Sequence, residues 1–148
     1  MDFTYALGLF ADHDAESAGN ILNRVWAKLE RDPDMRARIE KAEAIEGSNA
    51  KRLRREFRAV TGKDLSPTYL AKAQGTALGI VAAALPSTFV RALFDSRLLD
   101  RVVELYWGTK ATYGDPRGRE LFRAMITTHH AEFDVFRGGR ADATSATS

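Results

Sequence analysis

The sequence has no cysteine, which excludes disulfide bonds, thiolate zinc sites and cysteine nucleophiles. Any metal ion would therefore need carboxylate and imidazole ligands. The chain also lacks a strong excess of one charge, because 22 basic residues are balanced by 20 acidic ones. A net charge of +2 predicts no nucleic-acid partner, and the basic run KRLRREFR (Lys51 to Arg58) is expected to be the solvated face of a helix.

Long hydrophobic runs are missing too. The most apolar stretch, GTALGIVAAAL (Gly75 to Leu85), is much shorter than the roughly 20 residues of a membrane-spanning helix. The N-terminal stretch MDFTYALGLFADHD has no basic region ahead of its apolar residues, so no secretory signal is predicted and a cytoplasmic location is expected. With 45% hydrophobic residues, the chain is expected to form one domain over residues 1–137, followed by a small, polar, disordered tail over residues 138–148.

Helical periodicity dominates the rest of the sequence. No segment alternates with the period of a strand, so the fold class is predicted to be all-α. A first helix is expected from about Asp14 to Glu30, and a second from about Pro33 to Thr61, with Asp32 as its N-cap and Gly62 at its end. The predicted apolar faces are Ala15, Ala18, Leu22, Trp26 and Leu29 in the first helix, and Met35, Ile39, Ala42, Leu53, Phe57 and Val60 in the second.

Further helices are expected in the second half. The segment after Ser66-Pro67 becomes apolar on all sides, which predicts a buried helix or, alternatively, contact with a membrane surface. The segment RLLDRVVELYWGTKATYG predicts another helix, and Asp115-Pro116 begins the last one as Asp32-Pro33 begins the second. In the helix before Asp115, the residues expected to face inward are Leu99, Val102, Val103, Tyr106 and Tyr113.

Polar residues interrupt the apolar faces at related positions. Glu46 and Asn49 project into the apolar face of the second helix, where an unpaired carboxylate would be destabilised by several kcal/mol. Alignment of the chain with itself on its two Asp-Pro pairs matches them with His129 and Glu132, which indicates two related helical hairpins. His130 points away and is expected to be solvated. The four matched residues are either metal ligands or a buried polar network in which Glu46 and Asn49 hydrogen-bond to His129.

Three stretches carry a family resemblance. DHDAE (Asp12 to Glu16) is similar to an Asp-His-Ala-Gly-Glu motif, and EGSN (Glu46 to Asn49) to a Glu-x-x-His motif. SPTYLAKAQGTALGIVAAAL (Ser66 to Leu85) is similar to a Pro-Thr/Ser-x-Leu segment followed by Gly-x-x-Leu-Gly and an Ala/Leu-rich run. From roughly Asp12 to Asp134 the chain thus resembles the demethoxyubiquinone hydroxylases, the di-iron monooxygenases of ubiquinone biosynthesis. The resemblance implies a ferritin-like four-helix bundle of two helical hairpins, with an extra apolar helix in the crossover.

The resemblance also implies a di-iron site, with ligand positions at Glu16, Glu46, Asn49, Asp100, His129 and Glu132. Asn49 stands where the family has histidine, and HHAE (His129 to Glu132) exchanges the order of glutamate and histidine. Asp95 and Glu104 are alternatives to Asp100 as the carboxylate of the second half. Carboxylates and imidazoles suit iron because they hold a hard cation while leaving positions open for oxygen.

The implied activity is oxygen-dependent hydroxylation of a quinone or another ring with an isoprenoid tail, at the inner face of the membrane. A channel for the tail would be lined by Leu78, Val81, Leu85 and Tyr106. Two alternatives stay open. One is a non-catalytic relative that binds lipid or quinone without metal, which Asn49 favours, and the other is an iron-storage bundle that forms a large homo-oligomer.

Overall fold

A computed structural model describes residues 3–138, and within this range the chain forms six α-helices, one short 3-10 helix and no strand. The all-α prediction is confirmed. The α-helices are α1 Phe3–Leu29, α2 Pro33–Thr61, α3 Tyr69–Ala84, α4 Ser87–Asp95, α5 Leu98–Tyr113 and α6 Arg119–Arg137, and the 3-10 helix η1 is Pro116–Gly118. Apart from Gly138, the tail that was predicted to be disordered lies outside the described residues.

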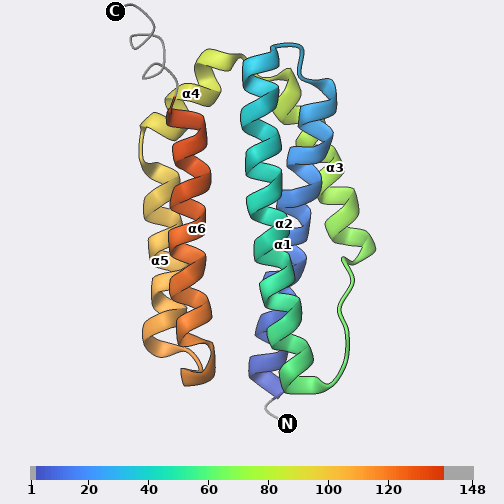
Figure 1. Cartoon of the computed structure of the whole chain (residues 1–148), viewed down its shortest axis with the longest axis vertical. Helices are drawn as coiled ribbons and strands as arrows, with labels where there is room; N and C mark the ends of the chain where they lie inside the picture. The colour runs from blue at the N-terminus through green and yellow to red at the C-terminus, as the bar shows by residue number, and fades with distance from the viewer. Residues whose placement is uncertain (1–2, 139–148) are drawn as a thin grey trace, which may run out of the picture.

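The helices form two antiparallel hairpins, α1 with α2 and α5 with α6 (Figure 1). The connection between the hairpins runs back along the outside through α3 and α4, so α5 starts at the opposite end of the molecule from the end of α2 (Figure 1). α2 lies against α6, whereas α3 packs on α1. As a result α2 and α5 point in the same direction, and residues from both hairpins face one common interior.

Local signals in the sequence explain where the long helices begin and end. The Asp32 carboxylate accepts hydrogen bonds from the backbone N–H groups of Asp34 and Met35, and Gly62 ends α2 with φ +70°. Both predicted boundaries of α2 are confirmed. Asp115 caps the short helix η1 in the same way, so α6 begins after this extra turn rather than at the proline.

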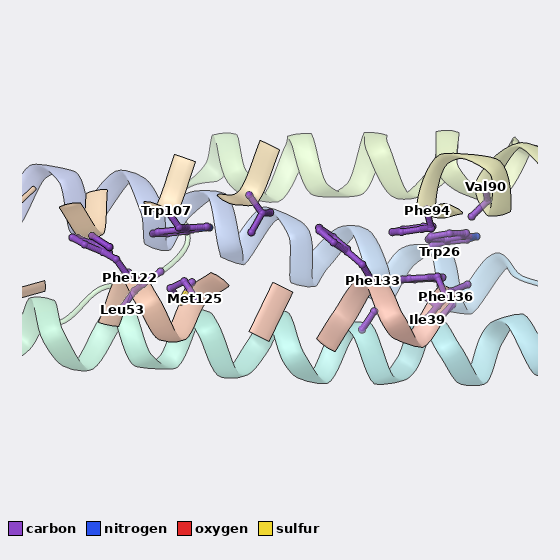
Figure 2. Packing of buried hydrophobic residues seen from close by; sticks show 14 of the residues in the cluster. Trp26, Ile39, Leu53, Val90, Phe94, Trp107, Phe122, Met125, Phe133 and Phe136 are labelled. Atoms are coloured by element: carbon purple, nitrogen blue, oxygen red, sulfur yellow. The ribbon is translucent and has the colours of Figure 1, made fainter. Parts of the chain in front are cut away.

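The hydrophobic core contains two groups of large side chains (Figure 2). One group includes Leu53, Trp107, Phe122 and Met125, and the other includes Trp26, Ile39, Phe94, Phe133 and Phe136. In the second group, the rings of Phe94 and Phe136 stack at 4.3 Å between centroids. Glu46 falls between Ile39 and Leu53 along α2, and His129 between Met125 and Phe133 along α6. The polar residues singled out from the sequence therefore lie between two apolar layers.

The first helix differs from the prediction in its start and in its buried face. α1 begins at Phe3 rather than near Asp14, and its buried residues include Leu9, Glu16 and Asn23. The backbone carbonyls of Ala18 and Leu22, two residues expected to face the core, lie against the glycines of α3, while the Leu22 side chain packs at the edge of the core. The helix is thus packed on more than one side, against α2 and the interior between the hairpins on one side and against α3 on another.

The predictions for α5 and α3 also differ from the structure. On α5, Val103 is buried and Leu99 partly buried as predicted, but Val102, Tyr106 and Tyr113 are 54%, 48% and 86% exposed. The other buried residues of α5 are Asp100, Trp107 and Ala111. On α3, the apolar run is not core, because Ala71, Gly75 and Gly79 are its only buried residues within this described helix. Its larger apolar side chains, among them Leu78, Ile80 and Val81, lie on the surface.

No single helix among residues 3–138 has the length and hydropathy needed to cross a bilayer. α3 and α4 satisfy those requirements only when they are taken together, and their axes differ in direction by 109°.

Candidate metal centre

Three helices bring carboxylate and imidazole groups together in the interior. Glu16 comes from α1, Glu46 from α2 and His129 from α6, and one potential ligand atom of each lies within 4.8 Å of those of the other two. Glu132, one turn after His129, is 6% exposed and interacts electrostatically with Glu46. Asn49 also lies beside Glu16, so five of the six predicted ligand residues are neighbours in the fold.

The orientation of the His129 ring is fixed at both nitrogens. Nδ1 donates a hydrogen bond to the backbone carbonyl of Met125 at 2.7 Å, and Nε2 lies 3.2 Å from Oε1 of Glu16. A backbone carbonyl that holds Nδ1–H keeps Nε2 as the nitrogen that can bind a metal. The imidazole thus directs its available nitrogen at the glutamates.

Several oxygen atoms of the cluster are buried without hydrogen bonds. Oε2 of Glu16, Oε2 of Glu46 and Oε2 of Glu132 have no hydrogen-bond partner, although almost no surface of these atoms is accessible. A buried carboxylate oxygen normally has a donor or a cation beside it, because its desolvation is otherwise unfavourable. A cation bound between Glu16, Glu46 and His129 would supply such a partner to the first two carboxylates.

The protonation states reflect this crowding of acidic groups. Burial raises the pKa of Glu46 well above its usual range, and the charges of Glu132 and Glu16 raise it further. Burial also raises the pKa of Glu132 to about 7, although the neighbouring His129 charge opposes this shift. Near neutral pH the metal-free cluster consequently keeps at least one carboxyl group protonated.

Glu16 and His129 form the charged pair of the cluster. Burial alone would raise the pKa of Glu16, but the hydrogen bond and charge of His129, together with hydrogen bonds from Glu46 and Asn49, outweigh it, so the pKa of Glu16 is lowered. Burial likewise lowers the pKa of His129, but the hydrogen bond and negative charge of Glu16 raise it more strongly, to about 9. A cation that binds here must displace the His129 proton.

Asn49 borders the cluster but does not direct its oxygen into it. Oδ1 of Asn49 accepts a hydrogen bond of 2.8 Å from the Thr128 hydroxyl, and the buried Nδ2 has no hydrogen-bond partner. Its nearness to Glu16 lowers the pKa of that carboxyl. In this orientation the amide offers a donor to the cluster, and a donor cannot bind a metal.

Asp100 lies away from the cluster in an ion pair. Arg137 donates two hydrogen bonds to the carboxylate, and Nδ1 of His130 lies 2.8 Å from its Oδ1. Burial raises the pKa of Asp100, but Arg137 and His130 outweigh this effect, so its pKa is lowered. His130 therefore has specific partners, although it was expected to be solvated. Its second partner is Glu104, at 3.2 Å.

The two alternatives to Asp100 do not reach the cluster either. Glu104 on α5 pairs with His130, and Asp95 is an exposed residue of α4. At the level of His129, α5 instead contributes Trp107, whose ring lies 6.0 Å from the imidazole between centroids. The predicted carboxylate of the second half is not brought together with the other ligands.

The residues predicted to line an apolar channel do not surround a common interior. Leu78, Val81 and Leu85 are 52%, 55% and 40% exposed on the outer side of α3. The Tyr106 hydroxyl donates to Oδ1 of Asp12 at 2.6 Å, and Lys110 binds the same carboxylate. Tyr106 therefore helps to join α1 to α5.

Two residues that support the cluster were not identified from the sequence. A Cβ atom on Gly19 would lie 2.9 Å from the Glu46 carboxyl carbon, so the absence of a side chain makes room for this carboxylate. Asn23, two turns after Glu16 on α1, is 5% exposed and lowers the pKa of Glu132 through a hydrogen bond. A polar residue at this spacing from Glu16 is the signal that could have identified Asn23.

Glu16, Glu46 and His129 thus offer two carboxylates and one imidazole to a common point in the interior, with the Glu132 carboxylate beside them, and such oxygen-rich ligands suit a hard divalent cation such as Fe²⁺ or Mn²⁺. No family model, curated protein or solved structure matches this chain.

Proposed function

We propose that this chain is a ferritin-like metalloprotein that binds iron in the cluster of Glu16, Glu46, His129 and Glu132. The observation that carries the proposal is the set of three buried carboxylate oxygens without partners beside an oriented imidazole. The arrangement of the helices supports the ferritin-like assignment. Two antiparallel hairpins are joined by one long crossover, as in ferritin-like bundles.

The four residues fit one cation better than two. Glu16, Glu46 and His129 can reach a common ion, and Glu132 lies beside them in hydrogen-bond contact with Glu46. The other two positions of the family pattern are occupied by the Asn49 amide and by Asp100 in its ion pair with Arg137. We therefore expect about one tightly bound ion per chain. When bound, iron would supply redox chemistry with oxygen.

We further propose that the chain oxidises a quinone or another isoprenoid-bearing ring, as the resemblance to demethoxyubiquinone hydroxylases implies. The exposed apolar side chains of α3 and α4 support contact with the membrane in which such a substrate dissolves. These residues are Leu78, Ile80, Val81, Leu85 and Phe89. Exposed apolar side chains on a short helix favour binding at a membrane surface rather than insertion across it.

Oxygen consumption tests the enzymatic part of this proposal. Iron-loaded, reduced protein is mixed with a quinone that carries an isoprenoid tail, and oxygen uptake is recorded with an electrode. Uptake is expected in the wild type and in Glu120→Ala, an exposed control on α6, but not in Glu46→Ala. If the wild type shows no quinone-dependent uptake above that of Glu46→Ala, the hydroxylase proposal is wrong.

A second candidate is a relative that binds lipid or quinone without metal. It is favoured by the ion pair between His129 and Glu16, which satisfies part of the cluster in the absence of an ion. Quenching of Trp26 and Trp107 fluorescence by a quinone would measure binding to chelator-treated protein. Tight binding without metal, combined with no oxygen uptake after iron loading, would select this candidate over the hydroxylase.

A further inference from the structure

A second polar site lies on the outside of the first hairpin. We name it the outer groove; it has a volume of about 730 Å³, within the usual range of pockets that bind small molecules. Its lining residues all come from α1, α2, the segment after α2 and the start of α3. Those used below are His13, Ser17, Ser48, Lys51, Arg54 and Lys72. The outer groove is therefore separate from the metal cluster, which faces α6.

His13 is a buried polar residue of the outer groove. It is 3% exposed, and its Nδ1 atom is buried without a hydrogen-bond partner. Burial, together with the charge of Arg54, lowers the pKa of His13, so the ring is uncharged at neutral pH. An unsatisfied imidazole nitrogen beside a hollow of this size indicates a missing polar partner.

Basic side chains line the end of the outer groove where His13 lies. Because α1 and α2 are antiparallel, His13, Lys51 and Arg54 lie toward the end opposite their connecting turn. Arg54 is neutralised by Asp64, but Lys51 and Lys72 form no ion pair within the described residues 3–138. A neighbouring hollow shares Ser48, Lys51 and Arg54 and adds two more arginines of α2. The two free lysines leave this end with a net positive charge.

We propose that the outer groove binds the phosphate group of a small phosphorylated ligand, with His13 as the buried hydrogen-bond partner and Lys51 and Lys72 as the cations. Lysine is a common phosphate ligand, and serine hydroxyls complete such sites. Ser17 and Ser48 supply these hydroxyls from α1 and α2. A nucleic acid is a poorer match, because the other end of the outer groove carries Glu40 and Glu43.

The test is a titration of the full-length protein with glycerol phosphate at constant ionic strength, followed by NMR of the histidine ring nitrogens. His13 is expected to shift in a saturable way, whereas His130, which lies in the other hairpin, should not. Lys51→Gln should weaken binding by about three- to tenfold, since it removes one charge-assisted contact. Lys41→Gln, an exposed lysine of the same helix outside the outer groove, should leave the affinity unchanged.

The source of the phosphate is distinguished by a second arm with phosphatidylcholine vesicles, prepared with and without phosphatidic acid. Saturable binding of glycerol phosphate with the His13 shift supports a soluble ligand. Binding only to the phosphatidic acid vesicles, weakened by Lys51→Gln, supports a lipid headgroup. If neither probe moves the His13 signals, or if Lys51→Gln binds as tightly as the wild type, the proposal is overturned. Metal content plays no part in either arm, so the result does not depend on the proposed iron site.

Discussion

At the scale of single residues, two members of the metal-free cluster are protonated, and a bound metal ion would displace their protons. His129 carries a positive charge because Glu16 accepts its Nε2–H, and Glu46 stays neutral because it is buried and two other carboxylates lie beside it. Metal ligands must be deprotonated, so a bound ion must release the protons of both residues. Metal affinity is consequently expected to rise with pH.

These bound protons make the stability of the metal-free chain depend on pH. The pKa of His129 is raised from 6.5 to about 9 in the folded state, so its contribution is fully present below pH 6.5 and is lost as the pH rises toward 9. The free energy of unfolding should fall by on the order of 2 to 3 kcal/mol across this window. Urea unfolding of chelator-treated protein at both ends of the range measures the loss. His129→Gln should reduce the loss to the part that comes from the raised pKa values of Glu46 and Glu132, and His130→Gln should keep it in full; equal losses in the wild type and His129→Gln would contradict this assignment.

Replacement of Asn49 by aspartate tests whether the amide limits the metal site. Asn49→Asp adds a carboxylate of the same shape at a fully buried position. Without metal, the extra buried charge should lower the free energy of unfolding by roughly 2 to 4 kcal/mol. With Mn²⁺, affinity by calorimetry should increase by about tenfold or more, because a third oxygen donor reaches the ion from α1 and α2. Gln74→Glu makes the same chemical change on the surface of α3 and serves as the control. Weaker Mn²⁺ binding in Asn49→Asp would argue against an ion in this cluster.

At the scale of helices, α3 depends on close approach to α1. A Cβ atom on Gly79 would lie 2.7 Å from the Leu22 carbonyl oxygen and 2.7 Å from Cβ of Val25, and Gly75 makes a similar contact one turn earlier. Only residues without a side chain allow the two backbones to pack at this separation. The large apolar side chains of α3 are left on the outside as a result.

Gly79→Val should therefore loosen α3 without disturbing the metal cluster. The added side chain must displace α1 backbone, and we expect a loss of about 1 to 3 kcal/mol in the free energy of unfolding. Metal content should stay at the wild-type value, because no residue of α3 belongs to the cluster. Ala77→Val, at an exposed position of the same helix, should change the stability by less than about 0.5 kcal/mol. Equal stability of the two variants would mean that the α1–α3 contact is unimportant.

The junction of α1 with α5 depends on one buried acid. Both carboxylate oxygens of Asp12 bind Lys110, and Tyr106 donates to the same group. Lys110 also lies 4.6 Å from the centroid of the Tyr106 ring. Because Asp12 is 1% exposed, its negative charge is stabilised chiefly by these two partners from the second hairpin.

Asp12→Asn should destabilise the packing of the two hairpins. We expect a loss of about 1 to 2 kcal/mol, less than for a fully buried pair because the Lys110 side chain is 27% exposed. Thermal unfolding monitored by circular dichroism measures the change, with Asp95→Asn on exposed α4 as the control. A melting temperature equal to that of the control variant would exclude this ion pair as a stabilising contact.

At the scale of the whole molecule, the sequence predicts the helices better than their buried faces. The class and the boundaries of α2 follow from periodicity and from Asp32, Pro33 and Gly62, which act locally. The buried faces of α1, α3 and α5 could not be predicted in this way, because each helix has apolar residues on more than one side. Which side is buried depends on distant partners, such as the glycines of α3 against α1.

The candidate site, too, could be predicted where sequence spacing was informative and not where it depends on tertiary packing. The related spacing of Glu46 with His129 and of Asn49 with Glu132 singles out residues that the fold does bring near Glu16. Asp100 was predicted as a ligand from its position in the sequence relative to the family pattern. Its actual pairing with Arg137 and His130 depends on the packing of α5 against α6. The roles of Gly19 and Asn23 required knowledge of which helix faces Glu46.

The central claim is that a metal ion binds between the two hairpins, and metal content tests it most directly. Untagged wild type, Glu46→Ala and the exposed control Glu120→Ala are purified from iron-supplemented cells, and bound metals are counted by plasma mass spectrometry. We predict about one ion per chain in the wild type and in Glu120→Ala, and none in Glu46→Ala. A metal-free wild type, or an ion that survives in Glu46→Ala, would contradict the account and leave His129 and Glu16 as a buried ion pair.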